Sequence, residues 1–473
     1  MRERAAQELN PKMGRMGPKI RRGLFGRASE SGVILCGMRA GALTSAGAGL
    51  ILLAACTSTT PNATPASAII QIGVDLPLTG AEAPAAVPAL NGIRFYVDKH
   101  PTISGFQVQF KTTDDARGGK PSPELGAANV QSFVADSNVV AMLGPFDASV
   151  ARREIPIANG ADLAMVTPAT SSPCLTRDVF VPALLNPAYT PISCKTAGLP
   201  SASELRPKHV NNFFRLTATD ELQGAAAADY AYGRFHVLRA AVISDHEAYG
   251  QGLVDAFSAR LQRMGGTVVG HLDIDPRLPD ATAFLKAAKA DGAQAVYFGG
   301  VSGDHECTIR AQMKSIFDSG EATPFLAGDG VAQDPGCVKD AGDNAQGIYA
   351  TVPIVDADSS LVAADTIRAF RAAYGNVRDY GPYTLLAYDA TAILYSAIRQ
   401  AIAAAGGSKP ARAGVIAQLV ATTGYPGVTG FIGFDALGDT TNRQISIFEA
   451  TGSDPRAPWR LAATIDYSSG LPY

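Results

Sequence analysis

Short apolar runs alternate with amphipathic stretches through the first part of the chain. The apolar runs predict strands at Ile69–Asp75, Phe106–Thr112, Val139–Leu143 and Leu163–Val166. Between them, helices are predicted over Asn91–His100, over Glu124–Ala135 and in a segment that ends near Asn159. Strands that alternate with helices in this way predict a parallel sheet covered on both faces.

A second series of the same kind begins at Phe213–Asp220, after an irregular, proline-containing insertion between about residues 175 and 212. An apolar run that ends in Ala241-Val242-Ile243 predicts a strand. The helix that follows carries Leu253, Phe257, Leu261 and Met264 on one face. Further strands are predicted at Gly266–Leu272, Ala295–Phe298 and Pro324–Ala327, and further helices at Ala281–Ala290 and Thr308–Ser319. Two such series predict two lobes rather than one long sheet.

The remaining segments are less regular. They predict a strand at Gly347–Val352, helices at Ser360–Tyr374, Tyr383–Ala405 and Arg412–Thr422, and a β-ribbon made of Gly430–Asp435 and Gln444–Ala450. If the lobes exchange chain more than once, these elements complete both lobes across a hinge of several strands. We expect the first lobe to comprise residues 69–218 and 353–428, and the second to comprise residues 219–352 and 429–473.

The composition of 473 residues, with 47% hydrophobic and 18% charged side chains, supports large buried cores. Residues 1–55 contain nine basic and three acidic side chains, which leaves 31 basic and 40 acidic ones in the rest of the chain. The rest therefore carries a net charge of −9, and this argues against a nucleic-acid partner.

The segment Met38–Cys56 has the layout of an export signal: one arginine, a short apolar stretch and a small-residue cleavage site. Its ending, Leu53-Ala54-Ala55-Cys56, resembles the lipobox of bacterial lipoproteins, in which the cysteine becomes the lipidated first residue. An ordinary signal with a chance cysteine is the alternative. We therefore interpret residues 1–55 as a signal region, in which Met38 is an alternative translation start. Residues 56–68 are interpreted as a tether rich in Ser, Thr, Pro and Ala. Arg21-Arg22 lacks the context of a twin-arginine signal.

Four cysteines remain in the predicted folded body: Cys174, Cys194, Cys307 and Cys337. An even number in an oxidising compartment favours disulfides, of which three pairings are possible. The nearest-neighbour pairing joins Cys174 to Cys194 and Cys307 to Cys337. A zinc site is the alternative, but no pair has the spacing of two to four residues that zinc sites use.

The loop Asp245–Tyr249 follows a predicted strand, and open α/β sheets bind ligands at the carboxyl ends of their strands. This loop belongs to a set of short motifs whose order and spacing, over nearly all of residues 69–473, resemble the type I periplasmic solute-binding proteins. Within these, the similarity is to the leucine/isoleucine/valine-binding family of ABC importers. The motifs are Asp75-Leu-Pro-Leu-Thr-Gly80, Gly144-Pro145, Val166-Thr-Pro-Ala-Thr-Ser-Ser-Pro173, Asp245 with Tyr249-Gly250, Phe298-Gly-Gly300, Tyr388-Asp389-Ala390, and Gly430 with Phe434-Asp435 and Gly438-Asp439.

The resemblance implies two Rossmann-like lobes with parallel sheets, joined by three crossovers, that close on a small solute. In family members with amino-acid ligands, backbone N–H groups and hydroxyls of the first lobe hold the carboxylate, and an acid of the second lobe contacts the ammonium. The residues that match these positions are Ala169, Ser171, Tyr249, Asp329 and Tyr383, and Ser149 could replace a family serine where this chain has Ala148. Val301 also departs from the aromatic residue that the family often has.

Each of these residues has a structural alternative. Ser171 could cap a helix, Tyr249 could cover the lobe surface, and Asp329 lies between two glycines in an ordinary turn composition. The acid–histidine clusters at Asp245–Glu247 and Asp304–Cys307 lack the spacing of a metal site, and no nucleophile with a base is recognisable, so we expect neither an enzyme nor a metal or cofactor site.

The resemblance implies an exported, lipid-anchored solute-binding protein outside the cytoplasmic membrane. It would capture a branched-chain amino acid or a related solute and deliver it to the permease subunits of an ABC importer. Amides, urea and small aromatic acids remain alternative ligands. A ligand-sensing receptor module is the alternative function, although a spanning helix and a signalling domain would be expected after such a module, and the sequence stops at Tyr473.

Overall fold

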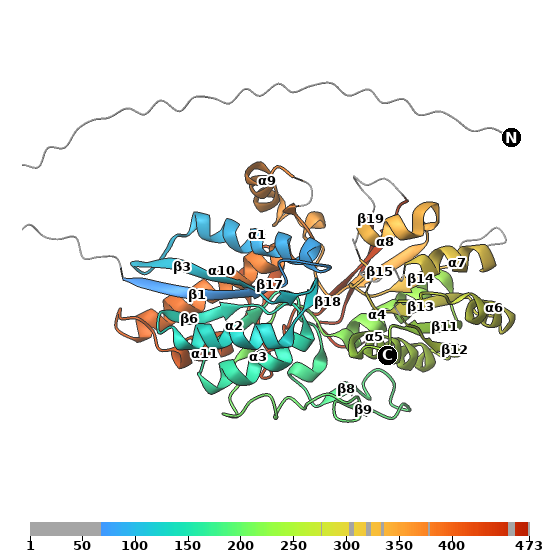
Figure 1. Cartoon of the computed structure of the whole chain (residues 1–473), viewed down its shortest axis with the longest axis horizontal. Coiled ribbons are helices and arrows are strands. Elements are labelled where there is room, and N and C mark those ends of the chain that lie inside the picture. The colour runs from blue at the N-terminus through green and yellow to red at the C-terminus, as the bar shows by residue number, and fades with distance from the viewer. Residues whose placement is uncertain are drawn as a thin grey trace, which may run out of the picture. The chain divides into compact units, whose positions relative to one another are not determined.

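A computed structural model describes residues 68–275, 277–301, 307–317, 323–332, 335–376, 379–452 and 459–471. The predicted signal region, the tether with Cys56, and the acidic cluster at residues 304–306 lie outside these ranges. Residues 63–473 form one compact unit, which contains two large sheets with helices packed on them (Figure 1).

The first sheet has the strand order β10-β7-β6-β1-β3-β2. Its strands are β1 (Ile69–Leu76), β2 (Thr102–Ile103), β3 (Phe106–Asp114), β6 (Val139–Leu143), β7 (Ala164–Thr167) and β10 (Phe213–Arg215). All neighbours are parallel except the short β2, which is antiparallel to β3. Every residue of β6 and β7 is buried, as a parallel sheet covered on both faces requires.

The second sheet has the order β12-β11-β13-β14-β15-β18-β19. Five parallel strands, β11 (Arg239–Ser244), β12 (Thr267–Asp273), β13 (Ala295–Gly299), β14 (Phe325–Ala327) and β15 (Ile348–Val352), are extended by the antiparallel β18 (Gln444–Ala450) and β19 (Trp459–Asp466). The two predicted α/β series are therefore confirmed as two parallel sheets. We call each sheet with its helices the first and the second lobe.

The helices pack in pairs along the sheets. In the first lobe α10 (Thr384–Ala404) packs on both α1 (Ala83–Lys99) and α11 (Arg412–Val420). A second pair is formed by α2 (Pro123–Ala135) and α3 (Ala148–Gly160). The helix α9 (Ala364–Ala373) contacts α1 through the rings of Phe370 and Phe95. In the second lobe α4 (Asp220–Phe235) packs on α5 (Ala248–Arg263), and α6 (Thr282–Ala290) and α8 (Pro335–Ala341) both pack near α7 (Thr308–Phe317). Short elements complete the chain: β4 (Ala116–Arg117), β5 (Lys120–Pro121), β16 (Tyr425–Gly427), β17 (Gly430–Ile432), and the 3₁₀ turns at Pro173–Leu175, Gly342–Asn344 and Ala357–Ser359.

The chain passes between the lobes at three places, and hydrogen bonds tie these crossings together. Ala218 N donates to Pro353 O at 3.1 Å, and Arg215 N donates to Gly438 O at 3.0 Å. Gly438 approaches so closely that a Cβ there would lie 2.2 Å from the carbonyl oxygen of Phe213, and its φ is +88°. Only glycine satisfies both conditions, so this residue is fixed by the hinge.

A buried ion pair crosses the same region. Arg215, which is fully buried, donates through Nε to Asp439 Oδ1 at 2.7 Å, and Arg177 Nε donates to the other oxygen of Asp439 at 2.8 Å. Burial acts to raise the pKa of Asp439, but the charges of Arg215 and Arg177 hold it below its usual value. The carboxylate therefore stays ionised between the first and third crossings.

The insertion after β7 contains the strands β8 (Val179–Val181) and β9 (Ile192–Ser193) and a disulfide between Cys174 and Cys194. Although it leaves from the first lobe, its Phe180 is buried in a cluster with Ala256 and Ala259 of α5 in the second lobe. The insertion thus spans both lobes. A second disulfide joins Cys307 to Cys337, so the nearest-neighbour pairing is confirmed for both bridges.

Two predictions of local structure were wrong. Gly430–Asp435 does not pair with Gln444–Ala450: β17 pairs with β16, and β18 pairs with β15 and β19. The turn between β16 and β17 is held to α10 by Asp389, whose Oδ2 accepts from Thr429 N at 2.8 Å. The helix predicted from Asn91 begins at Ala83, because Pro84 lies in the first turn, where proline is tolerated.

Breaking the hinge ion pair should destabilise the whole fold. We expect Asp439→Asn to lower the free energy of unfolding by about 3–5 kcal/mol, because it leaves the Arg215 charge buried without compensation. Urea unfolding followed by circular dichroism measures this. Lys208→Ala, which removes the exposed pair with Asp162, is the matched control and should cost about 1 kcal/mol or less. Equal losses in the two variants would contradict the structural role of Asp439.

Candidate functional site

Tyr249, Asp329 and Tyr383, which are far apart in the sequence, meet where the two lobes face each other. Tyr249 lies in the first turn of α5 just after β11, and Asp329 follows β14, so both stand at the carboxyl end of strands in the second lobe. Tyr383 immediately precedes α10 of the first lobe. The site therefore has the location expected of an open α/β sheet.

The carboxylate of Asp329 accepts hydrogen bonds from both lobes. Its Oδ1 accepts from Tyr249 Oη at 2.5 Å and from Gln223 Nε2 at 2.9 Å, and its Oδ2 accepts from Tyr383 Oη. Gln223 also accepts from the backbone N of Asp329 at 2.9 Å. One side chain of the second lobe thus binds a residue of the first lobe directly, which is the contact of a closed arrangement.

The two tyrosines act as donors to this carboxylate. Burial and then the charge of Asp329 raise the pKa of both Tyr249 and Tyr383 well above the usual value of a phenol. Each hydroxyl therefore keeps its proton at physiological pH. The Tyr383 ring also packs edge-on against Phe146, with centroids 5.1 Å apart, and this fixes its direction.

Ser171 is linked to the same group of residues through Asp220. Its carbonyl oxygen accepts from Asp220 N at 3.1 Å, and its side chain acts to lower the pKa of Asp220. Asp220 begins α4 and is 4% exposed. Burial and then the charge of Asp329 nevertheless raise the pKa of Asp220 to about 7. Ser171 is therefore joined through its backbone to the first residue of α4.

Ala169 and Ser149 are near the same junction but already have partners within the chain. Ala169 N donates to Thr167 Oγ1 at 3.2 Å. Ser149 bonds Asp147 through both its backbone N, at 2.7 Å, and its Oγ, at 2.5 Å. Their contact with a ligand stays a prediction.

Sequence reasoning did not select four acidic or polar residues of this region: Glu82, Asp147, Asp220 and Gln223. Three of them have a helix-terminal position in common, since Glu82 and Asp147 precede α1 and α3, and Asp220 is the first residue of α4. Acids at such positions commonly stabilise helix ends, so their type alone did not distinguish them. A usable signal was that Glu82, Asp147 and Asp220 follow β1, β6 and β10, at the carboxyl edge of the first sheet, as Tyr249 follows β11 in the second.

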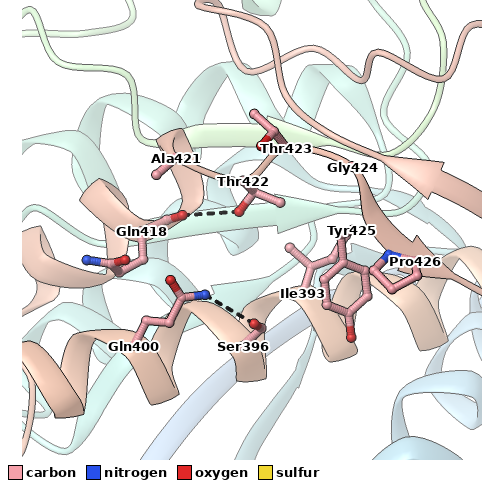
Figure 2. A pocket seen from close by; sticks show the side chains of 10 residues that line it. All are labelled: Ile393, Ser396, Gln400, Gln418, Ala421, Thr422, Thr423, Gly424, Tyr425 and Pro426. Carbon is pink, nitrogen blue, oxygen red and sulfur yellow. Dashed lines mark hydrogen bonds between the residues drawn. The ribbon is translucent and has the colours of Figure 1, made fainter.

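A separate surface pocket of about 240 Å³ lies between α10, α11 and the segment that leads into β16 (Figure 2). Its polar side chains bond their own neighbours: Gln400 Nε2 donates to Ser396 Oγ at 3.3 Å, and Thr422 Oγ1 donates to Gln418 O at 3.1 Å. None of its ten lining residues is charged. Because Asp329 and its hydrogen-bond partners are not among these lining residues, the pocket is a distinct feature, and we take the junction of the lobes as the candidate site.

The loop Asp245–Glu247 is a turn. Asp245 Oδ1 accepts from Glu247 N at 3.0 Å, and His246 has a φ of +66°. Among the residues that the structure describes, no group of three or more His, Cys, Asp or Glu is arranged to hold a metal ion. A search of the same residues finds no helix that is both long and apolar enough to cross a membrane.

Asp220 should make stability depend on pH. The native protein holds this proton more tightly than the unfolded chain, so the free energy of unfolding falls as pH rises from about 4 to about 7. We expect Asp220→Asn to remove this loss. The free energy of unfolding of the variant, relative to that of the parent, should therefore rise by a few kcal/mol between pH 4 and pH 8. Urea unfolding at both pH values measures the gain, with the exposed Asp291→Asn as control. A difference from the parent that is the same at both pH values would contradict the assignment.

The chain matches known proteins over most of its length. The family model described as "Periplasmic binding protein" matches residues 69–454. "Leu/Ile/Val-binding protein homolog 3" of Brucella melitensis is 28% identical over 390 residues, which are 82% of this chain and 93% of that protein.

Solved structures show the same fold. The leucine-binding protein LivK of Thermotoga maritima superposes with a TM-score of 0.66 at 23% identity, covering 85% of this chain and all of that one. A solute-binding protein of an ABC transporter from Rhodopseudomonas palustris, in complex with p-hydroxybenzoic acid, gives a TM-score of 0.66 at 16% identity, covering 84% and 97%. With two parallel lobes and a match that extends over most of its length, the chain belongs to the periplasmic binding protein family.

Proposed function

We propose that this exported protein captures an amino-acid-like solute, a branched-chain amino acid or a related compound, and delivers it to the permease subunits of an ABC importer. The observation that carries this proposal is the Asp329 carboxylate, which lies at the junction of the lobes and is contacted from both of them. A partly buried carboxylate surrounded by hydroxyl donors is suited to an ammonium group, because the ammonium satisfies it with both charge and hydrogen bonds. The names of the similar Leu/Ile/Val-binding proteins support the same ligand class.

Capture would couple binding to closure of the lobes. The hinge would let residues 69–218 and 353–428 move against residues 219–352 and 429–473. In the open state Tyr383 would leave Asp329, and a ligand ammonium would replace its hydroxyl on return. Contacts that the ligand makes with both lobes exist only in the closed state, so binding shifts the population toward closure. Ser171, Ala169 and Ser149 would contact the solute from the first lobe.

Two alternative functions differ from this proposal, one in the ligand that is bound and the other in the process that binding serves. The same fold could bind amides, urea or small aromatic acids, and the similar R. palustris protein was solved with p-hydroxybenzoic acid. It could also act as a ligand-sensing receptor module without a transporter. Binding of an amide or an aromatic acid in preference to every amino acid would favour the first alternative.

We also propose that Cys56 carries a lipid anchor. The sequence Leu53-Ala54-Ala55-Cys56 supports this, and a tether rich in Ser, Thr, Pro and Ala would hold the folded body off the outer face of the membrane. One acyl chain gives marginal membrane binding, so stable anchoring needs two lipid signals, as a multiply acylated cysteine would provide.

Binding should depend on Asp329. In calorimetric titrations with branched-chain amino acids, amides, urea and 4-hydroxybenzoate, we expect an amino acid to bind. We expect Asp329→Asn to weaken binding about tenfold or more, because it removes the charge that faces the ammonium. The exposed Asp365→Asn is the control and should bind as the parent does. An unchanged affinity in Asp329→Asn would remove the ammonium site from the proposal.

Anchoring should depend on Cys56. We expect Cys56→Ser to release the protein from membranes into the soluble extracytoplasmic fraction, because the residue that receives the lipid is lost. Fractionation and immunoblotting measure this, with the buried disulfide variant Cys174→Ser as a control that leaves the anchor intact. Membrane association that persists in Cys56→Ser would rule out this anchor.

A further inference from the structure

Gln223 is a buried glutamine whose side-chain amide contacts Asp329 twice. It lies in the first turn of α4 and is 0% exposed. Its Nε2 donates to Asp329 Oδ1 at 2.9 Å, and its Oε1 accepts from the backbone N of Asp329 at 2.9 Å. Because one bond holds the main chain and the other holds the carboxylate, the side-chain torsions of Asp329 between these two points are fixed as well.

The other hydrogen-bonding groups of the Gln223 amide are also occupied. Thr351 Oγ1, on β15, donates to Gln223 Oε1 at 3.1 Å and shares its proton with Ala327 O, which lies 3.2 Å away. Gln223 Nε2 also donates to Asp220 Oδ1, at 3.4 Å. A glutamine amide has two N–H donors and two acceptor lone pairs, and all four are in use here. Gln223 therefore has no group left for a solute.

The backbone around Asp329 is placed by close packing on both sides. A Cβ at Gly328 would lie 2.5 Å from Leu253 Cδ1, and a Cβ at Gly330 would lie 2.8 Å from the carbonyl oxygen of Gly300. Larger residues do not fit at either position, so the loop cannot shift toward its neighbours. Packing thus sets the place of the backbone and leaves the direction of the carboxylate to its hydrogen bonds.

The two carboxylate oxygens of Asp329 are used unequally. Its Oδ1 accepts from Gln223 and Tyr249, which both belong to the second lobe, whereas its Oδ2 accepts from Tyr383 of the first lobe. Separation of the lobes would therefore leave both bonds to Oδ1 in place and remove the one to Oδ2. The oxygen that faces the other lobe is the one that a solute can take.

We propose, on the basis of the function proposed above, that Gln223 is a positioning residue for solute binding. It holds the Asp329 carboxylate so that Oδ2 is directed across the junction at the cationic group of the solute, and Thr351 orients the amide that does so. Gln223 does not touch the solute itself. A carboxylate that is held in advance does not have to be ordered when the solute binds, and this raises affinity.

A double-mutant cycle with leucine as the probe tests this by titration calorimetry of the full chain. Gln223→Met keeps the length of the side chain and removes its bonds to Asp329, so we expect it to weaken leucine binding about tenfold. In the Asp329→Asn background, where the carboxylate is absent, the same change should weaken binding about twofold or less. Equal losses in the two backgrounds would show that Gln223 acts only on the fold, and would overturn the proposal.

Thr351→Val provides a second, milder variant, because valine has nearly the same shape and lacks the hydroxyl that donates to Gln223 Oε1. We expect it to weaken leucine binding about threefold, again only where Asp329 is present. Gln262→Met, on the exposed face of α5, is the matched control and should bind as the parent does. Circular dichroism establishes which variants are folded. If Gln223→Met does not fold, an unchanged affinity in Thr351→Val overturns the proposal.

Hydrogen exchange without any solute separates this inference from the proposed function. The Asp329 amide donates to Gln223 Oε1, so we expect it to exchange at least about tenfold faster in Gln223→Met, while the amides of β11 keep their rates. Mass spectrometry with residue-level fragmentation measures this. An unchanged rate at Asp329, or the same acceleration throughout the second lobe, would overturn the positioning role. If leucine does not bind the parent, the proposed ligand class fails, and the exchange rates still decide whether Gln223 holds Asp329.

Discussion

The buried pair of Arg215 and Asp439 is the interaction on which the two-lobed arrangement depends. Arg215 ends the last strand of the first sheet, and Asp439 lies in the third crossing, just before the chain enters the second sheet at β18. Because Gly438 also bonds the backbone of Arg215, the first and third crossings are fixed to each other. Such a pair adds little net stability over apolar residues, but it specifies which segments meet. Motion of the lobes must then take place around a fixed point.

Two further contacts limit that motion unequally. Tyr383 reaches Asp329 by one hydrogen bond, which water could replace at small cost when the lobes separate. The insertion, in contrast, buries Phe180 against α5 of the second lobe and is closed by the bridge between Cys174 and Cys194. Separation on that side would expose apolar surface. The physical asymmetry favours an opening that begins at Tyr383, with the insertion side acting as part of the hinge.

The sequence predicted the lobes well because buried parallel strands such as Val139–Leu143 are continuous apolar runs. It failed for the ribbon at Gly430, since apolar periodicity defines a strand without its partner, and β18 found its partners in β15 and β19. At the site, Tyr249 was predicted from its place after a strand, and Asp329 from the family resemblance. Their direct bond was not predicted, because it depends on how α5 and the loop after β14 lie in the second lobe, and the place of Asp220 depends on how α4 packs, which no local pattern encodes.

The acids at the junction carry a cost that the rest of the fold must offset. For Asp220, a shift of the pKa from 3.8 to about 7 corresponds to about 4 kcal/mol against the ionised form in the native state. A fold with a stability of only about 5–15 kcal/mol does not retain such a cost where packing alone would serve, because an apolar residue at the start of α4 would avoid it. Perturbed carboxyls concentrate where a protein must bind charge. Under the function proposed above, the cost at Asp220 is stability given up for a cationic ligand, and the hinge ion pair and the two large cores make it tolerable.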